Sequence, residues 1–404
     1  MIQKQKIILL VLLSLVLGAC SLTTIEKSSR NPANTGIDAL FGPEFSFTNS
    51  KILNSMTGAT DYANKLNIDI LREWKAKFEL LCVVLACKVV KTSDKHGEAY
   101  RIKFEDGFWL QAGTDTGCLE VQAKPSTVSE FTERKDIIKR MIWESGAELD
   151  LKPHVRIGGG HVNVDLKTAF PNNDALLFRN FVVDQANNPH LVAGIFGNHT
   201  GNSPPISALE PHLHDSFKDT IRIFDETLDA TGGLAAMQHL GKEIDRRVYV
   251  SNPFWLNNKK KVWTPSYYQH LSFRSIGQSV AEEQRRIELR GFRPQQTINE
   301  FILEAEFING RLTYLRDINR PIEVKIPKRI NFSRQEKISR FTELVKESRL
   351  DEARFKYFAD YPFENQAFIV DSPRVDTPTP SPEARFRSGI NPMNQCLSVF
   401  RTVR

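Results

Sequence analysis

Residues 160–165 read GHVNVD, and this stretch decides the fold because three other strings along the chain share its pattern. They are FGPEFSF at residues 41–47, DTGCLEV at 115–121 and IELR at 287–290. Successive side chains of a β-strand point to opposite faces, so in each string the polar groups share one face and the apolar groups the other. The four strings therefore predict a sheet with one polar face.

The polar face of this sheet carries carboxylates, one imidazole and one guanidinium. Its expected members are Glu44, Ser46, His161, Asn163, Asp165, Glu288 and Arg290. Carboxylate and imidazole groups suit a divalent metal, and an arginine fork binds phosphate through two hydrogen bonds. The face is therefore predicted to bind a metal ion and a phosphorylated ligand.

In order and arrangement, the four strings resemble the motifs of the amidoligase family of carboxylate-amine ligases, which is similar to glutamine synthetase and glutamate-cysteine ligase. That family opens on Gly-x-Glu-x-Glu, continues with an Asp-Gly-Ser segment and a Glu-x-x-x-x-Pro strand, then a Gly-x-His-x-His strand, and closes on Glu-x-Arg. The matching positions here are residues 42–46, Asp115 with Glu120 and Pro125, residues 160–163 and residues 288–290. The resemblance covers residues 38–300.

The resemblance implies an α+β fold, with a mostly antiparallel sheet that has one polar ligand-binding face and is flanked by helices, like the catalytic fold of glutamine synthetase. It also implies an ATP-dependent ligase that joins a small-molecule or peptide carboxylate to an amine, with peptides or the cell wall as the expected context. ATP would phosphorylate the carboxylate, and the amine would attack the acyl phosphate to form the amide.

The resemblance implies a role for each site residue. Glu44, His161 and Glu288 would hold one divalent metal, and two carboxylates with one imidazole suit magnesium or manganese. Arg290 would hold the transferred phosphoryl group of ATP, as a catalytic and cofactor-binding residue. Glu120 would be a ligand of a second metal and the other catalytic residue.

Two positions depart from the pattern of the family. Ser46 stands where the family has the second glutamate of its opening motif, so the second metal loses a ligand. Asn163 replaces the second histidine, which alters the phosphate contact that this cofactor-binding position would make. The sequence therefore leaves an alternative to the active ligase: a catalytically degraded envelope lipoprotein that uses the ligase fold as a binding module.

The amino terminus resembles a lipoprotein signal peptide. Lys4 and Lys6 precede an apolar run at residues 7–17, which is shorter than the roughly 20 residues that span a bilayer as a helix, and Gly18-Ala19 lead to Cys20. Residues 1–19 would be the signal peptide, with Cys20 lipidated and bound to the membrane. Because Ser follows the cysteine, we expect the outer membrane in a Gram-negative cell envelope; an ordinary secretory signal is the alternative.

Composition sets the remaining expectations for the 404-residue chain. An apolar fraction of 41% and a charged fraction of 25% are typical of a globular protein. A net charge of +6 without a basic and aromatic array argues against nucleic-acid binding. We expect a tether at residues 20–36, an amidoligase-like domain at 37–330, and a helical and proline-rich region at 331–404.

Periodicity and turn residues predict the other elements. A hairpin with a turn at Asp106-Gly107 is expected in residues 98–123, and further strands at 155–166, 267–274 and 285–292. Helices are expected at 127–145, 174–187, 207–229, 233–247, 297–307 and 334–358, and loops or linkers at 194–205 and 371–383.

The cysteines beyond Cys20 form no Cys-x-x-Cys pair, so they indicate neither zinc nor thioredoxin-like chemistry. Cys82 and Cys87 lie in an apolar stretch, and on a strand their spacing would put them on opposite faces. We therefore expect buried free thiols and no bridge between them. Cys118 lies near the serine position of the family motif, which leaves a nucleophilic role open, although no base is placed to activate it.

Overall fold

The computed structural model describes most of the chain from Gly36 to Asp360. Within that range it leaves out residues 56–59, 95, 116, 155–158, 192–204, 210, 250–269, 278 and 329–331. The predicted signal peptide, Cys20, nearly all of the tether, almost the whole loop at 194–205, Cys396 and the proline-rich linker lie outside the described residues. In the part that is described, no helix is both long and apolar enough to cross a membrane.

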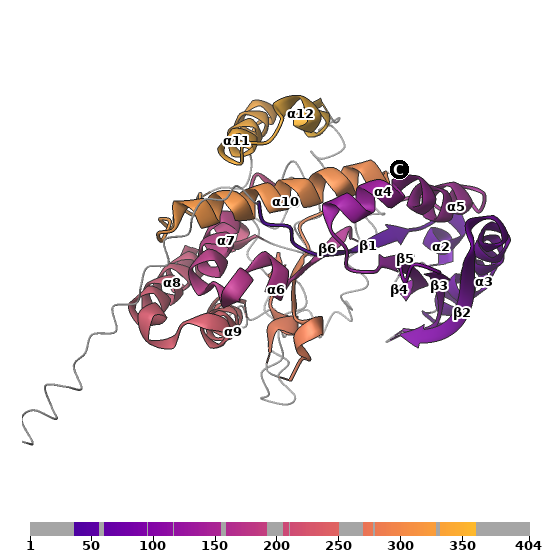
Figure 1. Ribbon diagram of the computed structural model, residues 1–404, viewed down its shortest axis with the longest axis horizontal. Coiled ribbons are helices and arrows are strands. Elements are labelled where there is room, and N and C mark those ends of the chain that lie inside the picture. The colour runs from indigo at the N-terminus through magenta and orange to yellow at the C-terminus, as the bar shows by residue number, and fades with distance from the viewer. Residues whose placement is uncertain are drawn as a thin grey trace, which may run out of the picture. The chain divides into compact units, whose positions relative to one another are not determined.

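An eight-stranded antiparallel sheet forms the centre of the fold, in the order β2-β3-β4-β5-β1-β6-β8-β7 (Figure 1). Its strands are β1 (Phe41–Phe47), β2 (Cys87–Asp94), β3 (Gly97–Phe104), β4 (Trp109–Asp115), β5 (Cys118–Ala123), β6 (His161–Asp165), β7 (Leu271–Ser272) and β8 (Arg286–Leu289). With helices flanking this sheet, the predicted α+β class is confirmed.

The predicted hairpin is present as β3 and β4. Asp106 and Gly107 form the turn, in which the Asp106 carboxylate accepts a hydrogen bond of 2.9 Å from the Phe108 amide and Gly107 has a φ of 82°. Only glycine adopts such a backbone angle without a steric penalty. The dipeptide therefore sets the register that pairs Tyr100 with Ala112.

The helices expected at 127–145, 174–187, 207–229, 233–247 and 297–307 are present with longer or shorter bounds, and further helices accompany them. The described helices are α2 (Ser50–Ser55), α3 (Thr60–Leu85), α4 (Val128–Ile138), α5 (Ser145–Ala147), α6 (Leu166–Ala169), α7 (Ala175–Asn187), α8 (Pro211–Thr231), α9 (Gly233–Ile244), α10 (Ile298–Ile318), α11 (Arg334–Glu347) and α12 (Glu352–Asp360). Helix α4 begins at the expected capping box, in which Thr127 and Glu130 bond each other's backbone amides. A π-helical turn then extends it to Glu144.

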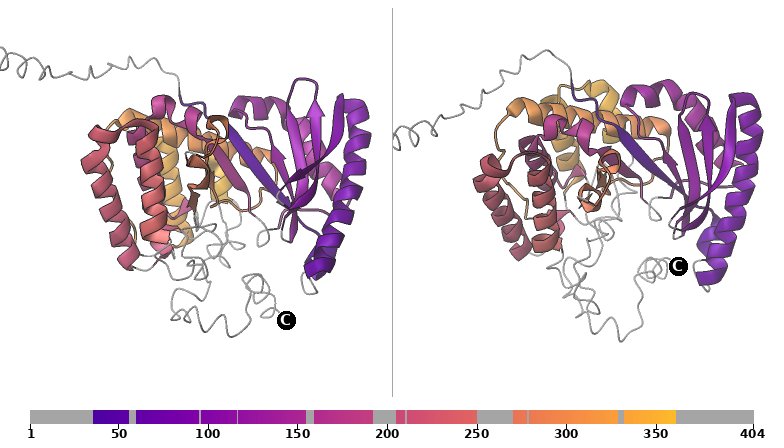
Figure 2. Two further views of the ribbon diagram at one scale, coloured as in Figure 1. Left: turned by 90° about the horizontal axis from the view of Figure 1, so that it is seen from below. Right: turned by 60° about the horizontal axis from the view of Figure 1, so that its bottom comes forward.

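Helices α3, α4 and α10 cover the apolar face of the sheet (Figures 1 and 2). Phe45 and Phe47 point to this face from β1 and are buried. The ring of Phe45 lies 4.9 Å from that of Trp143 and 5.5 Å from that of Phe301, while Phe47 lies 5.5 Å from Trp74. This aromatic packing stabilises the central strand and leaves its polar side chains on the opposite face.

The C-terminal helices pack onto α10. The rings of Phe307 and Phe341 lie 5.2 Å apart, and Arg311 of α10 bonds Glu347 of α11 at 2.7 Å. The single helical segment expected at 334–358 is two helices, because Arg349 adopts a positive φ of 55° between them. Of the strands expected at 155–166 and 267–274, the structure describes β6 and β7 with the bounds given above, while residues 155–158 and 267–269 lie outside the described residues.

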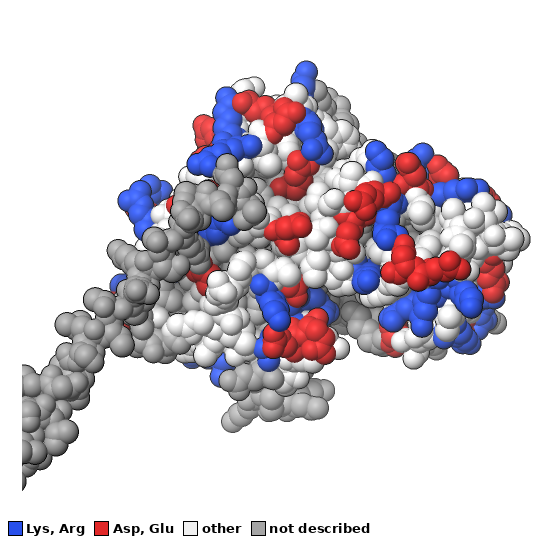
Figure 3. Space-filling view, in the orientation of Figure 1, with Lys and Arg blue, Asp and Glu red and all other residues white. Residues whose placement is uncertain are grey.

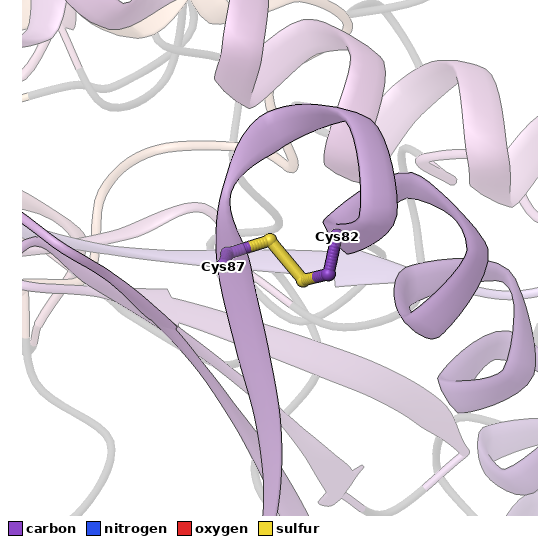
Figure 4. The surroundings of a disulfide bond; sticks show 2 residues. All are labelled: Cys82 and Cys87. Atoms are coloured by element: carbon purple, nitrogen blue, oxygen red, sulfur yellow. A yellow bond between two sulfur atoms is a disulfide. The ribbon is translucent and has the colours of Figure 1, made fainter.

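The expectation for Cys82 and Cys87 is wrong, because the two form a disulfide (Figure 4). Cys82 does not lie on a strand: α3 continues to Leu85, and Ala86 reverses the chain with a φ of 50°. The reversal brings the two Cα atoms to 4.6 Å, within the range that a disulfide requires. The bridge ties the end of α3 to the start of β2.

Candidate functional site

Three neighbouring strands bring predicted site residues onto one face. Strands β1 and β6 pair Glu44 with His161, and β6 and β8 pair Asn163 with Glu288. Directly opposite residues of an antiparallel pair project from the same face, so these side chains lie together. Arg290 follows Glu288 by two residues and projects from that face too.

Glu44, His161 and Glu288 form a compact cluster. Each offers one ligand atom, and these atoms lie within 4.8 Å of one another. The Nδ1 atom of His161 is 3.3 Å from Glu44 Oε2 and 3.3 Å from Glu288 Oε1. The three side chains are between 14% and 18% exposed, so the cluster is sheltered but open to solvent on one side. Two carboxylates and an imidazole at this spacing fit the donor set that magnesium or manganese accepts.

The environment of Glu44 favours its charged form. Burial by itself would raise its pKa, but the hydrogen bond and charge of His161, the amide of Asn163 and the charge of Arg290 together lower the pKa to about 2. The Asn163 amide donates to Glu44 Oε1 at 2.9 Å. Glu44 is therefore a carboxylate at neutral pH, which is the form that coordinates a metal.

Arg290 lies beside the cluster rather than within it. Its Nη1 atom bonds Glu288 Oε1 at 2.6 Å, and its backbone amide bonds the carbonyl oxygen of His270 at 2.9 Å. The Arg290 side chain is 16% exposed. A planar cation held next to a candidate metal site is placed to contact an anionic ligand of that metal.

Sequence reasoning missed Arg286, which extends the same polar row. Its Nε atom donates to Asn163 Oδ1 at 2.9 Å, and Asn163 in turn donates to Glu44. Asn163 thus links a second arginine to the cluster of Glu44, His161 and Glu288 through its side-chain amide. The signal was available: the strand expected at 285–292 includes Arg286, which alternates with Glu288 and Arg290 and therefore projects from the same face.

Two glycines before β6 allow His161 to take its place. A Cβ atom on Gly159 would lie 2.3 Å from His161 Nε2, and one on Gly160 would lie 2.1 Å from the carbonyl oxygen of Arg293. Ser46 donates to the Gly159 carbonyl at 2.8 Å, and Gln295 donates to that of Gly160 at 3.0 Å. Any larger residue at these positions would displace the start of β6.

Glu120 is not part of the cluster. It pairs with Ser46 across β5 and β1, and its carboxylate accepts a hydrogen bond of 2.8 Å from Gln122. Strand β1 separates it from His161. Ser46 itself is buried and bonded to the backbone, so it offers no carboxylate where the family pattern would place one.

The contacts of two other residues singled out in the sequence, Asp165 and Cys118, indicate structural roles. Asp165 accepts hydrogen bonds from the amide and hydroxyl of Thr168 and so caps α6. Cys118 is fully buried, and burial raises the pKa of its thiol well above the usual value. A protonated, enclosed thiol is a poor nucleophile, which argues against a catalytic role for Cys118.

His270, whose backbone carbonyl accepts a hydrogen bond from Arg290, is expected to make the stability of the protein depend on pH. The imidazole is buried with its Nε2 atom 3.0 Å from Gln185 Oε1, and burial lowers its pKa to about 3. Below a pH of about 6.5, His270 therefore binds a proton in the unfolded chain but stays neutral in the folded chain. We expect the free energy of unfolding to fall by up to about 1.4 kcal/mol per pH unit as the pH drops from 6.5 towards 5. Urea denaturation at several pH values, in the unmodified protein and in His270→Gln, measures this slope; an equal slope in the variant would contradict it.

Comparisons with known proteins do not assign this chain to a family. No family model and no curated protein matches the chain. Among solved structures, the chain is similar to GmaS without ligand, with 10% sequence identity and a TM-score of 0.33, over 91% of this chain and 72% of that one. A similarity at this level establishes neither a shared fold nor a shared activity.

Proposed function

We propose that this protein is an amidoligase-like protein that binds a divalent metal and ATP and joins a carboxylate to an amine. The observation that carries the proposal is the cluster of Glu44, His161 and Glu288 on one face of an antiparallel sheet, with Arg290 beside it. The motif resemblance assigns these residues to such a ligase, and their ligand atoms lie within 4.8 Å of one another.

The donor set fits magnesium or manganese. Glu44, His161 and Glu288 would hold the ion, and the charged state of Glu44 leaves it ready to coordinate. When bound, the metal would supply positive charge that stabilises the phosphates of ATP and the developing charge of the transition state. Arg290, already 2.6 Å from a ligand carboxylate, would add a second positive charge on the same side.

The proposed reaction needs two things from the residues of this chain. The first is a bound phosphoryl group, which Arg290 would orient while it passes to the substrate carboxylate. The second is shelter from water for the acyl phosphate until the amine attacks, because water would hydrolyse it. The substrates are proposed to be small-molecule or peptide carboxylates and amines, with cell-wall peptides as one candidate class.

A binding module without catalysis is the second candidate, and Ser46 favours it. A serine at this position leaves the second metal of the family pattern without one carboxylate ligand. Its hydroxyl is buried and donates to the Gly159 carbonyl at 2.8 Å, so it is not directed to a metal. The side-chain amide of Asn163 also donates to Glu44 and accepts from Arg286. Both of its polar atoms are therefore already hydrogen-bonded, whereas the histidine of the family pattern would contact a phosphate at this position. An exported protein would meet little ATP, which agrees with this second candidate.

Titration calorimetry on the purified protein, together with an assay for released phosphate, separates the two candidates. The ligase proposal expects manganese to bind, ATP to bind in its presence, and phosphate to be released when a carboxylate and an amine are supplied. The binding-module candidate expects one metal and weak or no binding of nucleotide. If no divalent metal binds, both are wrong, because both rest on the same cluster.

We also propose that the protein is anchored in the bacterial envelope by lipid on Cys20. Substituting serine removes the thiol that would be acylated, so Cys20→Ser is expected to shift the protein out of the detergent phase in a Triton X-114 partition. Cys118→Ser is the matched control, because Cys118 is buried in β5. Equal partition of Cys20→Ser and the unmodified protein would contradict the anchor.

A further inference from the structure

A line of directly opposite side chains crosses the polar face of the sheet, from the candidate metal site towards the edge strand. Glu44 of β1 lies opposite Gln122 of β5. Gln122 lies opposite Gln111 of β4, which in turn lies opposite Arg101 of β3. Directly opposite residues of antiparallel strands project from the same face, and three strand spacings of the sheet amount to about 14 Å. We call Gln122, Gln111 and Arg101 the polar row.

Arg101, at the far end of the polar row, is held in one orientation. Its Nε and Nη2 atoms donate to Gln111 Oε1 at 3.0 and 2.6 Å, and its Cζ atom lies 4.5 Å from the centre of the Trp109 ring. Among the residues that the structure describes, Arg101 forms no ion pair with a carboxylate. A partly buried guanidinium that is oriented but lacks a counter-charge is suited to bind an anion.

Two lysines add positive charge at the same end of the polar face. Lys88 of β2 lies directly opposite Lys103 of β3, two residues from Arg101, and both lysines are exposed. In the described part of the chain, neither lysine has an ion pair. Like charges directly opposite each other on neighbouring strands are destabilising, and an anionic ligand would relieve their repulsion. Figure 3 shows lysine and arginine side chains gathered over β2 and β3.

The middle of the polar row carries neutral amides. Gln122 donates through Nε2 to Glu120 at 2.8 Å. Gln111 accepts both bonds from Arg101 through Oε1. Within the described residues, the Gln122 oxygen and the Gln111 nitrogen make no further hydrogen bond. One acceptor and one donor side by side match the N–H and C=O groups of a peptide bond.

We infer that the polar row binds an extended acidic peptide as the carboxylate substrate. The reacting carboxylate lies at the candidate metal site, peptide bonds contact Gln122 and Gln111, and a second carboxylate contacts Arg101. An extended chain covers 14 Å with about four residues. The inference rests on the proposed function, because it places the reacting carboxylate beside the metal, and it adds a length and a second charge to the substrate.

A nucleotide matches the polar row less well than an acidic peptide does. Its phosphates would lie beside the metal and Arg290, at the other end of the line. Its base carries no anionic group for Arg101, and the two lysines would face no counter-charge. An acidic peptide supplies an anion at each end and amides between them, in the order in which the chain presents its partners.

Titration calorimetry of the full chain with manganese and synthetic peptides tests this substrate class. Succinyl-trialanine carries a carboxylate at each end and has about the length of four residues. Acetyl-trialanine has the same backbone with one carboxylate. The first peptide should bind at least about tenfold more tightly, because it adds a charge-assisted hydrogen bond to Arg101. Succinyl-alanine, which is too short to span the row, should bind no more tightly than acetyl-trialanine.

Arg101→Gln separates the basic end from the rest of the site. This substitution should weaken succinyl-trialanine binding about tenfold and leave the affinities for acetyl-trialanine and manganese unchanged, because Arg101 lies three strands from Glu44. Arg134→Gln is the matched control. Arg134 also lies over an aromatic ring, 4.9 Å from that of Phe108, but it pairs with Asp106 and belongs to α4, on the other face. It should change neither peptide affinity.

Lys103→Gln provides an arm that does not disturb folding, since Lys103 is exposed. It should weaken the binding of succinyl-trialanine about threefold and leave that of acetyl-trialanine unchanged, as expected for one solvent-exposed charge. Circular dichroism checks that each variant is folded.

The outcomes distinguish the inference from the function on which it rests. If manganese binds but the two trialanine peptides bind equally or not at all, the inference is wrong while the proposed function stands. An equal loss of both peptides in Arg101→Gln would also overturn it, since the residue would then act only through the fold. A loss of ATP affinity in place of peptide affinity would assign the basic end to the nucleotide. If manganese does not bind, the proposed function and the inference are both wrong.

Discussion

Replacing Glu44 with glutamine is expected to weaken manganese binding by at least about 100-fold, the upper end of the losses seen when even an outer partner of a metal ligand is removed. Glutamine keeps the size of the side chain and its bond to Asn163, but it removes the charge. Glu44 lies on β1, between β5 and β6 in the sheet, so the substitution leaves the backbone pairing intact. Isothermal titration with manganese gives the dissociation constants of the two proteins.

A matched substitution shows whether the effect is specific. Glu282→Gln removes a carboxylate that is 63% exposed and pairs with Lys167 on the surface, so it should leave metal affinity unchanged. If Glu44→Gln and the unmodified protein bind manganese equally well, Glu44 is not a ligand. The affinity of Glu288→Gln for manganese then tests a second proposed ligand of the same site.

Removing Asp184 is expected to destabilise the protein by about 3 to 5 kcal/mol, because the buried Arg311 then loses the more deeply buried of its two counter-charges and keeps only the partly exposed Glu347. Asp184 of α7 accepts two hydrogen bonds from Arg311 of α10, at 2.7 Å and 3.1 Å, and both side chains are almost fully buried. In Asp184→Ala, Arg311 would retain its bond to Glu347 and its contact with the ring of Tyr314. The free energy of unfolding from urea denaturation measures the loss.

The exposed pair of Arg222 and Glu226 is the control for this prediction. Their bond is 2.7 Å long, yet both side chains are about 60% exposed. Water replaces such a contact at little cost, so Glu226→Ala should change stability by less than about 1 kcal/mol. A loss in Asp184→Ala no larger than that of Glu226→Ala would contradict the role of the buried pair.

Local rules in the sequence predict much of the fold. Asp106-Gly107 determines a turn because of its backbone preferences, and Thr127 with Glu130 marks the start of a helix through reciprocal hydrogen bonds. Alternation along β1, β6 and β8 correctly predicts one polar face of the sheet. These features depend on neighbours within a few residues, which the sequence displays directly.

The features that the sequence does not predict depend on register and on ambiguous apolar runs. The stretch around Cys82 suits a buried strand as well as a helix, and only the long continuation of α3 makes the disulfide possible. Glu120 belongs to the right face, but its pairing with Ser46 keeps it a strand away from His161. Which strands become neighbours is decided by contacts between distant segments.

The cluster of Glu44, His161 and Glu288 is assembled from residues far apart along the chain, so the proposed metal binding would be coupled to folding. Glu44 and His161 are 117 positions apart, so the unfolded chain holds no preformed site. A ligand that binds only the native state stabilises it by mass action, by about 2.7 kcal/mol at 100 times its dissociation constant. If the chain crosses a membrane unfolded, it would therefore arrive without its metal and select one from the ions present where it folds.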